Sequence, residues 1–120
     1  MNLNFKVDAE PLTNGVHAVS VVGELDQSTA PELREALDQA MGNGNGAMFI
    51  DLSDCEFIDS TGLSLLVETQ RRMTDGERRF AVCCPGEDVR RLLELTGIDA
   101  ALGLYDTRDD ALASLNNNHS

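Results

Sequence analysis

The sequence predicts one α/β domain with a mixed central β-sheet and about four helices. Segments with the apolar pattern of strands alternate along the chain with segments that carry an apolar helical stripe, an order typical of α/β layer structures. An Asn-Gly pair at residues 14–15 favours a tight hairpin between the first two strands, which makes the sheet mixed. The chain has 120 residues, 42% of them hydrophobic, which suffices for one compact core.

The first half of the chain contains two strands and a helix. Leu3, Phe5 and Val7 alternate with polar residues, as in a half-buried strand, and residues 16–22 form a second strand antiparallel to it. Residues 23–26 leave that strand and lead to a helix that opens near Pro31, a residue suited to a first helical turn. The apolar stripe of this helix consists of Leu33, Ala36, Leu37, Ala40 and Met41.

A short apolar run over residues 47–50 predicts a central strand that is buried on both faces and ends at Asp51. After a short loop, a second helical stripe follows Ser60 and stops at the Asp-Gly pair of residues 75–76. This second stripe consists of Leu63, Leu66, Val67 and Met73.

The last third predicts a strand over residues 80–84 and a helix that Gly97 ends. A short edge strand at residues 104–105 and a final helix, with Thr107 and Asp110 in a capping-box arrangement, complete the order. We expect the domain to span residues 3–115 and residues 116–120 to form a disordered tail.

The net charge of −12 and the pI of about 4.3 disfavour two classes of partner. A nucleic-acid binder needs a basic stripe, and docking on anionic lipid needs the same. The chain has no apolar run long enough for a bilayer and no basic start with an apolar segment behind it. We therefore expect a cytoplasmic protein that binds neither nucleic acid nor membrane.

The residues that carry metal or enzyme chemistry are few. His17 and His119 are far apart and have no ligand spacing, so we expect no metal site and no bound cofactor. The odd number of cysteines, two of them adjacent, does not resemble a secreted disulfide framework. No nucleophile–base set and no phosphate-binding loop is visible, which argues against an enzyme. Cys83 and Cys84 are interpreted as small buried strand residues, whereas Cys55, nearer the loop, is the better candidate for a reactive thiol.

The stretch from Asp51 to Leu63 places the hydroxyl of Ser60 at the mouth of an amphipathic helix. Unpaired N–H groups of a first helical turn favour a phosphate at that point. Two readings of Ser60 remain open, since a serine before a helix also serves as a plain N-cap. Gly62 likewise either lets a partner's backbone approach or allows close packing within the domain.

The run Asp59-Ser60-Thr61-Gly62-Leu63, between a strand and an amphipathic helix, resembles the phosphorylation site of STAS domains. The subgroup it resembles is the bacterial anti-sigma factor antagonists. A second segment agrees with this: residues 23–26, Gly-Glu-Leu-Asp, followed by residues 29–33, Thr-Ala-Pro-Glu-Leu, are similar to that family's strand-to-helix junction. The resemblance implies that Ser60 is the phosphoacceptor, with Thr61 the nearest competing hydroxyl. It also implies a partner-binding surface, which consists of Asp26, Asp59, Thr61 and Gly62.

The resemblance further implies how such a switch works. The unphosphorylated form binds an anti-sigma factor that is also a serine kinase of the GHKL type, which frees the sigma factor for transcription in stress response or sporulation. Phosphorylation of Ser60 ends the binding, and a serine phosphatase restores it. Apart from the resemblance, we expect a monomer, because the partner-binding face of the domain must stay exposed.

Two alternatives within the same fold stay open at this point, and a third, outside it, is disfavoured. A STAS protein can serve as a non-switching scaffold of a stress-signalling complex or as an accessory of a lipid transporter. A response-regulator receiver domain would use Asp51 as its phosphoacceptor, but it needs a lysine late in the chain, and Lys6 is the only lysine.

Overall fold

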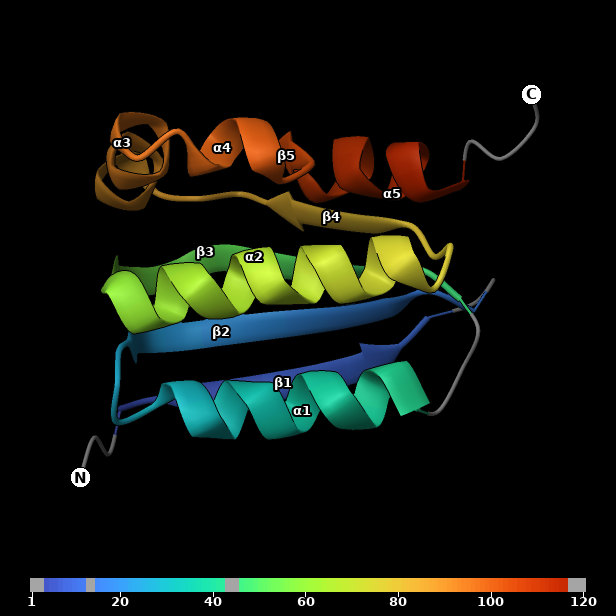
Figure 1. Cartoon of the computed structure of the whole chain (residues 1–120), viewed down its shortest axis with the longest axis horizontal. Helices are drawn as coiled ribbons and strands as arrows, with labels where there is room; N and C mark the ends of the chain where they lie inside the picture. Colours follow the sequence, from blue (N-terminus) through green and yellow to red (C-terminus); the bar gives the residue numbers. More distant parts are fainter. Residues whose placement is uncertain (1–3, 13–14, 43–45, 117–120) are drawn as a thin grey trace.

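The computed structural model describes residues 4–12, 15–42 and 46–116, and these form a mixed five-stranded sheet. The strands stand side by side in chain order, as Figure 1 shows. Only the first pair is antiparallel, and the other neighbouring strands are parallel. The predicted mixed α/β architecture is therefore confirmed. The strands are β1 (Lys6–Pro11), β2 (His17–Leu25), β3 (Met48–Ile58), β4 (Phe80–Cys83) and β5 (Leu104–Tyr105).

Five helices follow β2 within the described residues, and the last of them comes after β5. They are α1 (Ala30–Gly42), α2 (Ser60–Asp75), α3 (Glu87–Leu95), α4 (Ile98–Ala101) and α5 (Arg108–Asn116). The sequence predicted four of them and missed α4, because a single turn of four residues is too short for a helical period to show. Gly97 ends α3 as predicted, with a positive φ of 76° that suits glycine after a helix, and α4 begins directly behind it.

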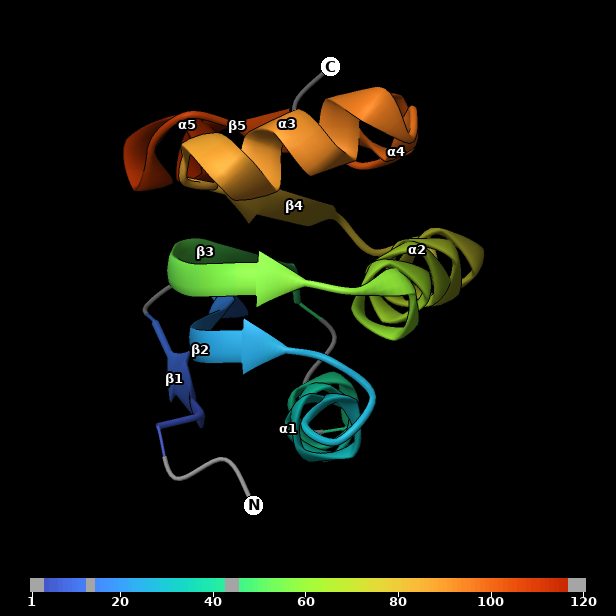
Figure 2. The same cartoon turned by 90° about the vertical axis from the view of Figure 1, so that its left-hand side faces the viewer.

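Helices cover both faces of the sheet, as Figures 1 and 2 show. On one face, apolar side chains of α1 and α2 such as Leu33 and Leu66 pack on strand residues such as Ile50. On the other face, a smaller cluster joins strand residues such as Phe49 to Ala111 and Leu115 of α5. The central strand is thus buried on both faces, as its apolar run predicted.

The strands run further than the sequence predicted. β2 continues to Leu25, and β3 does not end at Asp51 but continues to Ile58. The parallel ladder between them persists through two register irregularities and ends with the pair Leu25 and Ile58. The extension of β3 escaped prediction because its buried residues Leu52, Cys55 and Ile58 lie three apart and not two apart as in a regular strand. β1 also starts later than expected, at Lys6.

The C-terminal helix begins as its sequence predicted. The N–H of Asp110 donates a hydrogen bond to Oγ1 of Thr107 over 3.0 Å, the geometry of an N-cap. Asn116, which we expected in the tail, is the last residue of α5, whereas residues 117–120 lie outside the described part. Asn14 of the predicted hairpin and Leu3 of the predicted first strand lie outside it as well. None of the described helices is both long and apolar enough to cross a membrane.

Candidate functional site

The two segments that the sequence singled out meet at one end of the sheet. Leu25 of β2 pairs with Ile58 of β3, so the next residues, Asp26 and Asp59, leave the sheet side by side. The N–H of Asp59 donates to the carbonyl of Leu25 over 3.1 Å, and this bond joins the ends of β2 and β3. Helices α1 and α2 both begin at this end, the one that faces the viewer in Figure 2.

One carboxylate, that of Asp59, holds this junction. Oδ1 of Asp59 accepts the N–H of Gly62 over 3.0 Å and so caps α2, with an extended backbone at φ −100° and ψ −174°. Oδ2 of Asp59 accepts the N–H of Gln27, in the loop before α1, over 3.0 Å. The reading of Ser60 as the N-cap is therefore wrong. Asp and Ser are both preferred at N-caps, so the pair Asp59-Ser60 in the sequence leaves the capping residue open.

Ser60 is the first residue of α2 and is exposed. Within the described residues its hydroxyl makes no hydrogen bond, because Asp59 has taken over the capping role. The first turn of α2 also has fewer unpaired N–H groups for a phosphate than the sequence suggested. The N–H of Gly62 donates to the Asp59 carboxylate, and the N–H of Leu63 donates to the Asp59 carbonyl over 2.9 Å. The site therefore presents a free hydroxyl beside a carboxylate.

Asp26 organises the loop before α1. Its Oδ1 accepts the N–H of Ser28 at 2.9 Å, the hydroxyl of Ser28 at 2.7 Å and the N–H of Thr29 at 3.1 Å. The hydroxyl of Ser28 is the main cause that lowers the pKa of Asp26, against the opposing effect of desolvation, and the two N–H groups add to it. Asp26 is thus an ionised, half-buried carboxylate fixed at the junction.

Gly62 faces inward and is buried. A Cβ at this position would stand 2.8 Å from Cγ of Leu25, 2.9 Å from Cγ2 of Ile58 and 2.9 Å from the carbonyl oxygen of Leu25. Of the two readings that the sequence left open, the structure therefore supports close packing within the domain. The space where a partner's backbone would have approached is occupied by the ends of β2 and β3.

Ser60 and Thr61 are both exposed but face different grooves. Ser60 lines a groove of about 410 Å³ between α2 and α4, together with Leu63, Val67 and Ile98. Thr61 lines a groove of about 370 Å³ between α1 and α2. A partner that reads the α2–α4 groove therefore meets the hydroxyl of Ser60 and not that of Thr61.

The thiol candidate that the sequence favoured is not accessible. Cys55 is buried in the main core, and burial raises the pKa of its thiol to about 11. Cys84 is half-buried and is the more accessible of the two cysteines at the end of β4, whereas Cys83 is fully buried. The interpretation of Cys55 as the better reactive thiol is therefore wrong.

Comparison with known proteins agrees with this architecture. The family model of the STAS domain matches residues 10–111. The chain is 36% identical over 102 residues to the anti-sigma-F factor antagonist RsfB of Mycobacterium tuberculosis, a match that covers 85% of this chain and 83% of RsfB. It is 32% identical over 98 residues to the anti-sigma-B factor antagonist of Staphylococcus aureus, which covers 82% of this chain and 88% of that protein.

A solved structure of an anti-sigma factor antagonist from Mycobacterium paratuberculosis has the same fold. It superposes with a TM-score of 0.83 at 38% identity, over 92% of this chain and 93% of that one. The resemblance on which the sequence analysis drew is thereby confirmed at the level of the family. The chain belongs to the STAS domain family, among relatives named as anti-sigma factor antagonists.

Proposed function

We propose that this protein is an anti-sigma factor antagonist whose switch is the phosphorylation of Ser60. The unphosphorylated form binds an anti-sigma factor of the GHKL serine-kinase type and releases the sigma factor. The kinase transfers phosphate from ATP to Ser60, the complex separates, and a serine phosphatase restores the first state.

The observation that supports the proposal is that Asp59 caps α2, whereas the hydroxyl of Ser60 is exposed and takes no part in the cap. Asp59 caps α2 and joins the two loops, so the fold does not depend on the hydroxyl of Ser60. A hydroxyl that is exposed and free of internal hydrogen bonds can enter the active site of a kinase without local unfolding. Its phosphate then stands in solvent, so we expect the phosphorylated domain to remain folded.

The electrostatics of the junction supply the off-switch. A phosphate adds about −1.5 to −2 charges at neutral pH, beside the carboxylate of Asp59 and on the same edge as Asp26. In solvent this repulsion is screened, but in a closed interface the phosphate loses water and faces these groups directly. Two unit charges 4 Å apart at an effective dielectric of about 20 repel by about 4 kcal/mol, which lowers an affinity roughly a thousandfold.

The assignment of Ser60 as the phosphoacceptor can be tested by comparison with Thr61. Ser60 and Thr61 are adjacent hydroxyls that line different grooves. With a cognate kinase and labelled ATP, Ser60→Ala should abolish phosphate incorporation, whereas Thr61→Val should retain it. Because Asp59 is the cap, neither change should alter the far-UV circular dichroism of the protein.

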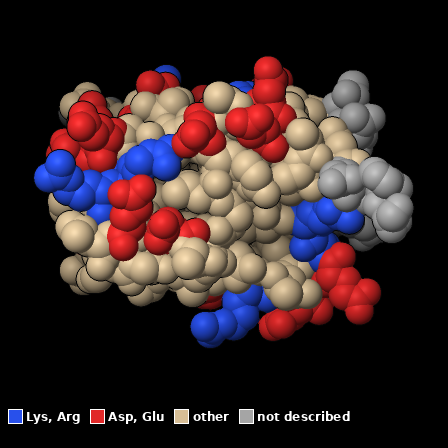
Figure 3. All heavy atoms as spheres, turned by 90° about the horizontal axis from the view of Figure 1, so that it is seen from above, with Lys and Arg blue, Asp and Glu red and all other residues tan. Residues whose placement is uncertain are grey.

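The surface fits a protein partner better than a polyanion. The net charge is −12, and Figure 3 shows acidic side chains beside arginines over α3, α4 and α5, without a continuous basic stripe on that face. We propose that the protein acts as a monomer in the cytoplasm, as a kinase substrate without catalysis of its own.

A pull-down from native lysate with ADP tests the proposed partner. Wild type, Ser60→Glu and the control Thr74→Glu serve as baits, since Thr74 is also exposed but lies at the other end of α2. Wild type and Thr74→Glu should retain a GHKL-type kinase, and Ser60→Glu should lose it. If all three baits retain the same partners and none is such a kinase, the protein is a scaffold or a transporter accessory instead.

A further inference from the structure

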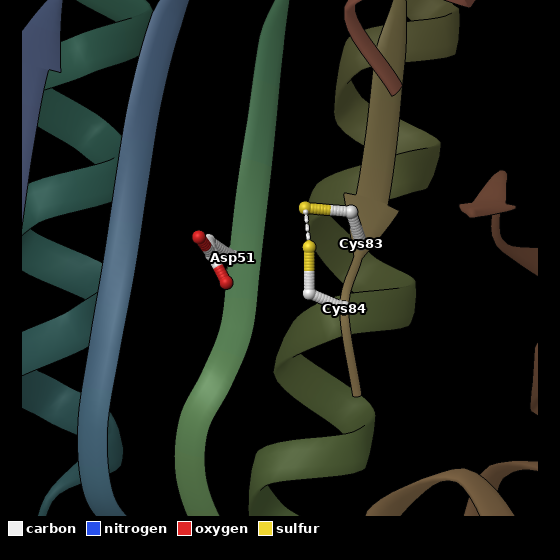
Figure 4. A group of neighbouring side chains, drawn as sticks. All are labelled: Asp51, Cys83 and Cys84. Atoms are coloured by element: carbon white, nitrogen blue, oxygen red, sulfur yellow. Dashed lines mark hydrogen bonds between the residues drawn. The ribbon is translucent and has the colours of Figure 1, made fainter. Parts of the chain in front are cut away.

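Two cysteines and a carboxylate converge on the face of the sheet that α5 covers, opposite the face on which α2 packs. Asp51 of β3 and Cys83 of β4 are direct partners in the parallel ladder. The sulfur of Cys84 lies 2.8 Å from that of Cys83. One carboxylate oxygen of Asp51 and the two sulfurs all lie within 4.8 Å of one another, the cluster drawn in Figure 4.

An unusual backbone conformation brings the two sulfurs together. Consecutive residues of a strand point to opposite faces of a sheet, so two adjacent cysteines would normally be kept apart. Cys84 has a φ of +68°, one of only two positive values among the described residues other than glycine. Its N–H remains bonded to the carbonyl of Tyr105 over 2.9 Å, which holds the conformation in place. Such a backbone conformation costs energy, and residues of this kind cluster at active sites, ligand clamps and switch regions.

The carboxylate of Asp51 is fixed by two further contacts. Nε of Arg108, from α5, donates to Oδ2 over 2.6 Å, and the N–H of Ser53 donates to Oδ1 over 2.8 Å. Each carboxylate oxygen accepts more than one bond, so a lone pair remains for a cation. Metal-binding carboxylates are commonly held in this way by outer hydrogen bonds.

We propose that Cys83, Cys84 and Asp51 form a binding site for a thiophilic divalent cation of the zinc class. Two thiolates and a carboxylate match the sulfur and oxygen ligands that Zn²⁺ takes, whereas Mg²⁺ and Ca²⁺ prefer oxygen alone. The charges also balance, since three negative ligands face one divalent ion and the guanidinium of Arg108. Three protein ligands leave the fourth tetrahedral position to water.

The cation fits with a small adjustment. With metal–sulfur bonds of about 2.3 Å, two sulfurs on a tetrahedral ion stand about 3.8 Å apart. The present 2.8 Å therefore has to widen by about 1 Å, which the half-buried side chain of Cys84 can provide. Binding releases the two thiol protons to solvent. Such a site cannot be recognised from spacing along the chain, because Asp51 joins the cysteines only through the pairing of β3 with β4.

Titration of the reduced full-length protein with Cd²⁺ alone tests the site, because thiolate-bound Cd²⁺ absorbs in the ultraviolet. We expect this absorption to saturate at one Cd²⁺ per chain, and Zn²⁺ to abolish it by competition. Cys84→Ser should weaken binding at least tenfold with an unchanged circular dichroism spectrum. Asp51→Asn should weaken it less, because both thiolates remain.

Cys55→Ser is the matched control, since Cys55 is buried in the core on the other face of the sheet. It should bind Cd²⁺ as wild type does. Cd²⁺ should also raise the melting temperature of wild type and of Cys55→Ser but not that of Cys84→Ser. The proposal is overturned if wild type shows no thiolate absorption with excess Cd²⁺, or if Cys84→Ser binds as tightly as wild type.

Discussion

Replacing Asp59 with alanine should destabilise the fold without touching the hydroxyl of Ser60. The change removes two hydrogen bonds to backbone N–H groups, one from Gly62 and one from Gln27, each 3.0 Å long. Loss of an N-cap costs about 1 kcal/mol. A second bond to a charged acceptor, partly exposed to solvent, contributes about 1 kcal/mol more. We expect Asp59→Ala to lower the free energy of unfolding by about 2 kcal/mol.

Urea unfolding followed by far-UV circular dichroism measures this loss, and Asp59→Asn separates the two bonds. The asparagine oxygen can still cap Gly62, but the amide nitrogen cannot accept the N–H of Gln27. Asp59→Asn should therefore cost about half as much as Asp59→Ala. Ser60→Ala should change stability by less than about 0.5 kcal/mol, as surface substitutions away from such contacts do.

Two other outcomes would contradict these roles of Asp59 and Ser60. If Ser60→Ala destabilises the protein as much as Asp59→Ala does, the serine is the cap and its hydroxyl is not free for a kinase. If Asp59→Asn is as stable as wild type, the bond to Gln27 contributes nothing and the two loops are joined by other contacts.

Three further outcomes are expected. Gly62→Ala should destabilise the fold by about 1–3 kcal/mol in thermal unfolding, because its Cβ would meet the ends of β2 and β3 at 2.8–2.9 Å. The control is Gly42→Ala, whose Cβ meets nothing within 4 Å and which should be neutral or slightly stabilising. Since burial raises the pKa of Cys55 to about 11, its thiol is almost fully protonated at pH 7–9, and mass spectrometry should find it unalkylated by iodoacetamide in that range unless the protein is unfolded. A double-mutant cycle on the exposed pair of Arg34 and Glu68, 2.6 Å apart, should give a coupling of at most about 1 kcal/mol, and a larger value would mean that this pair fixes α1 against α2.

Much of the fold could be predicted because its signals are local. The spacing of Leu33 and Leu37 indicates a helix with one buried face. The continuous apolar run before Asp51 indicates a strand that is buried on both faces. The capping of α5 by Thr107 was equally visible, because both partners lie within one turn. The length of β3 was not, since its pairing with β2 passes through register irregularities that no single strand reveals.

The candidate site could likewise be predicted only in part. Its location at the strand–helix junction could be predicted from the motif, but the roles within it depend on contacts between distant segments. The bond from Gln27 to Asp59 spans 32 residues, and the packing of Gly62 against Leu25 depends on where β2 ends. The cluster of Asp51 with the two cysteines is likewise a product of strand pairing.

The proposed switch requires that phosphate on Ser60 strongly weakens binding to the anti-sigma kinase while the domain stays folded. Its most direct test is the dissociation constant of the purified kinase, with ADP, for the unmodified protein and for the protein phosphorylated at Ser60. We expect tight binding of the unmodified form, an affinity roughly a thousandfold lower for the phosphoprotein, and matching circular dichroism spectra. Equal affinities for two folded forms would contradict it.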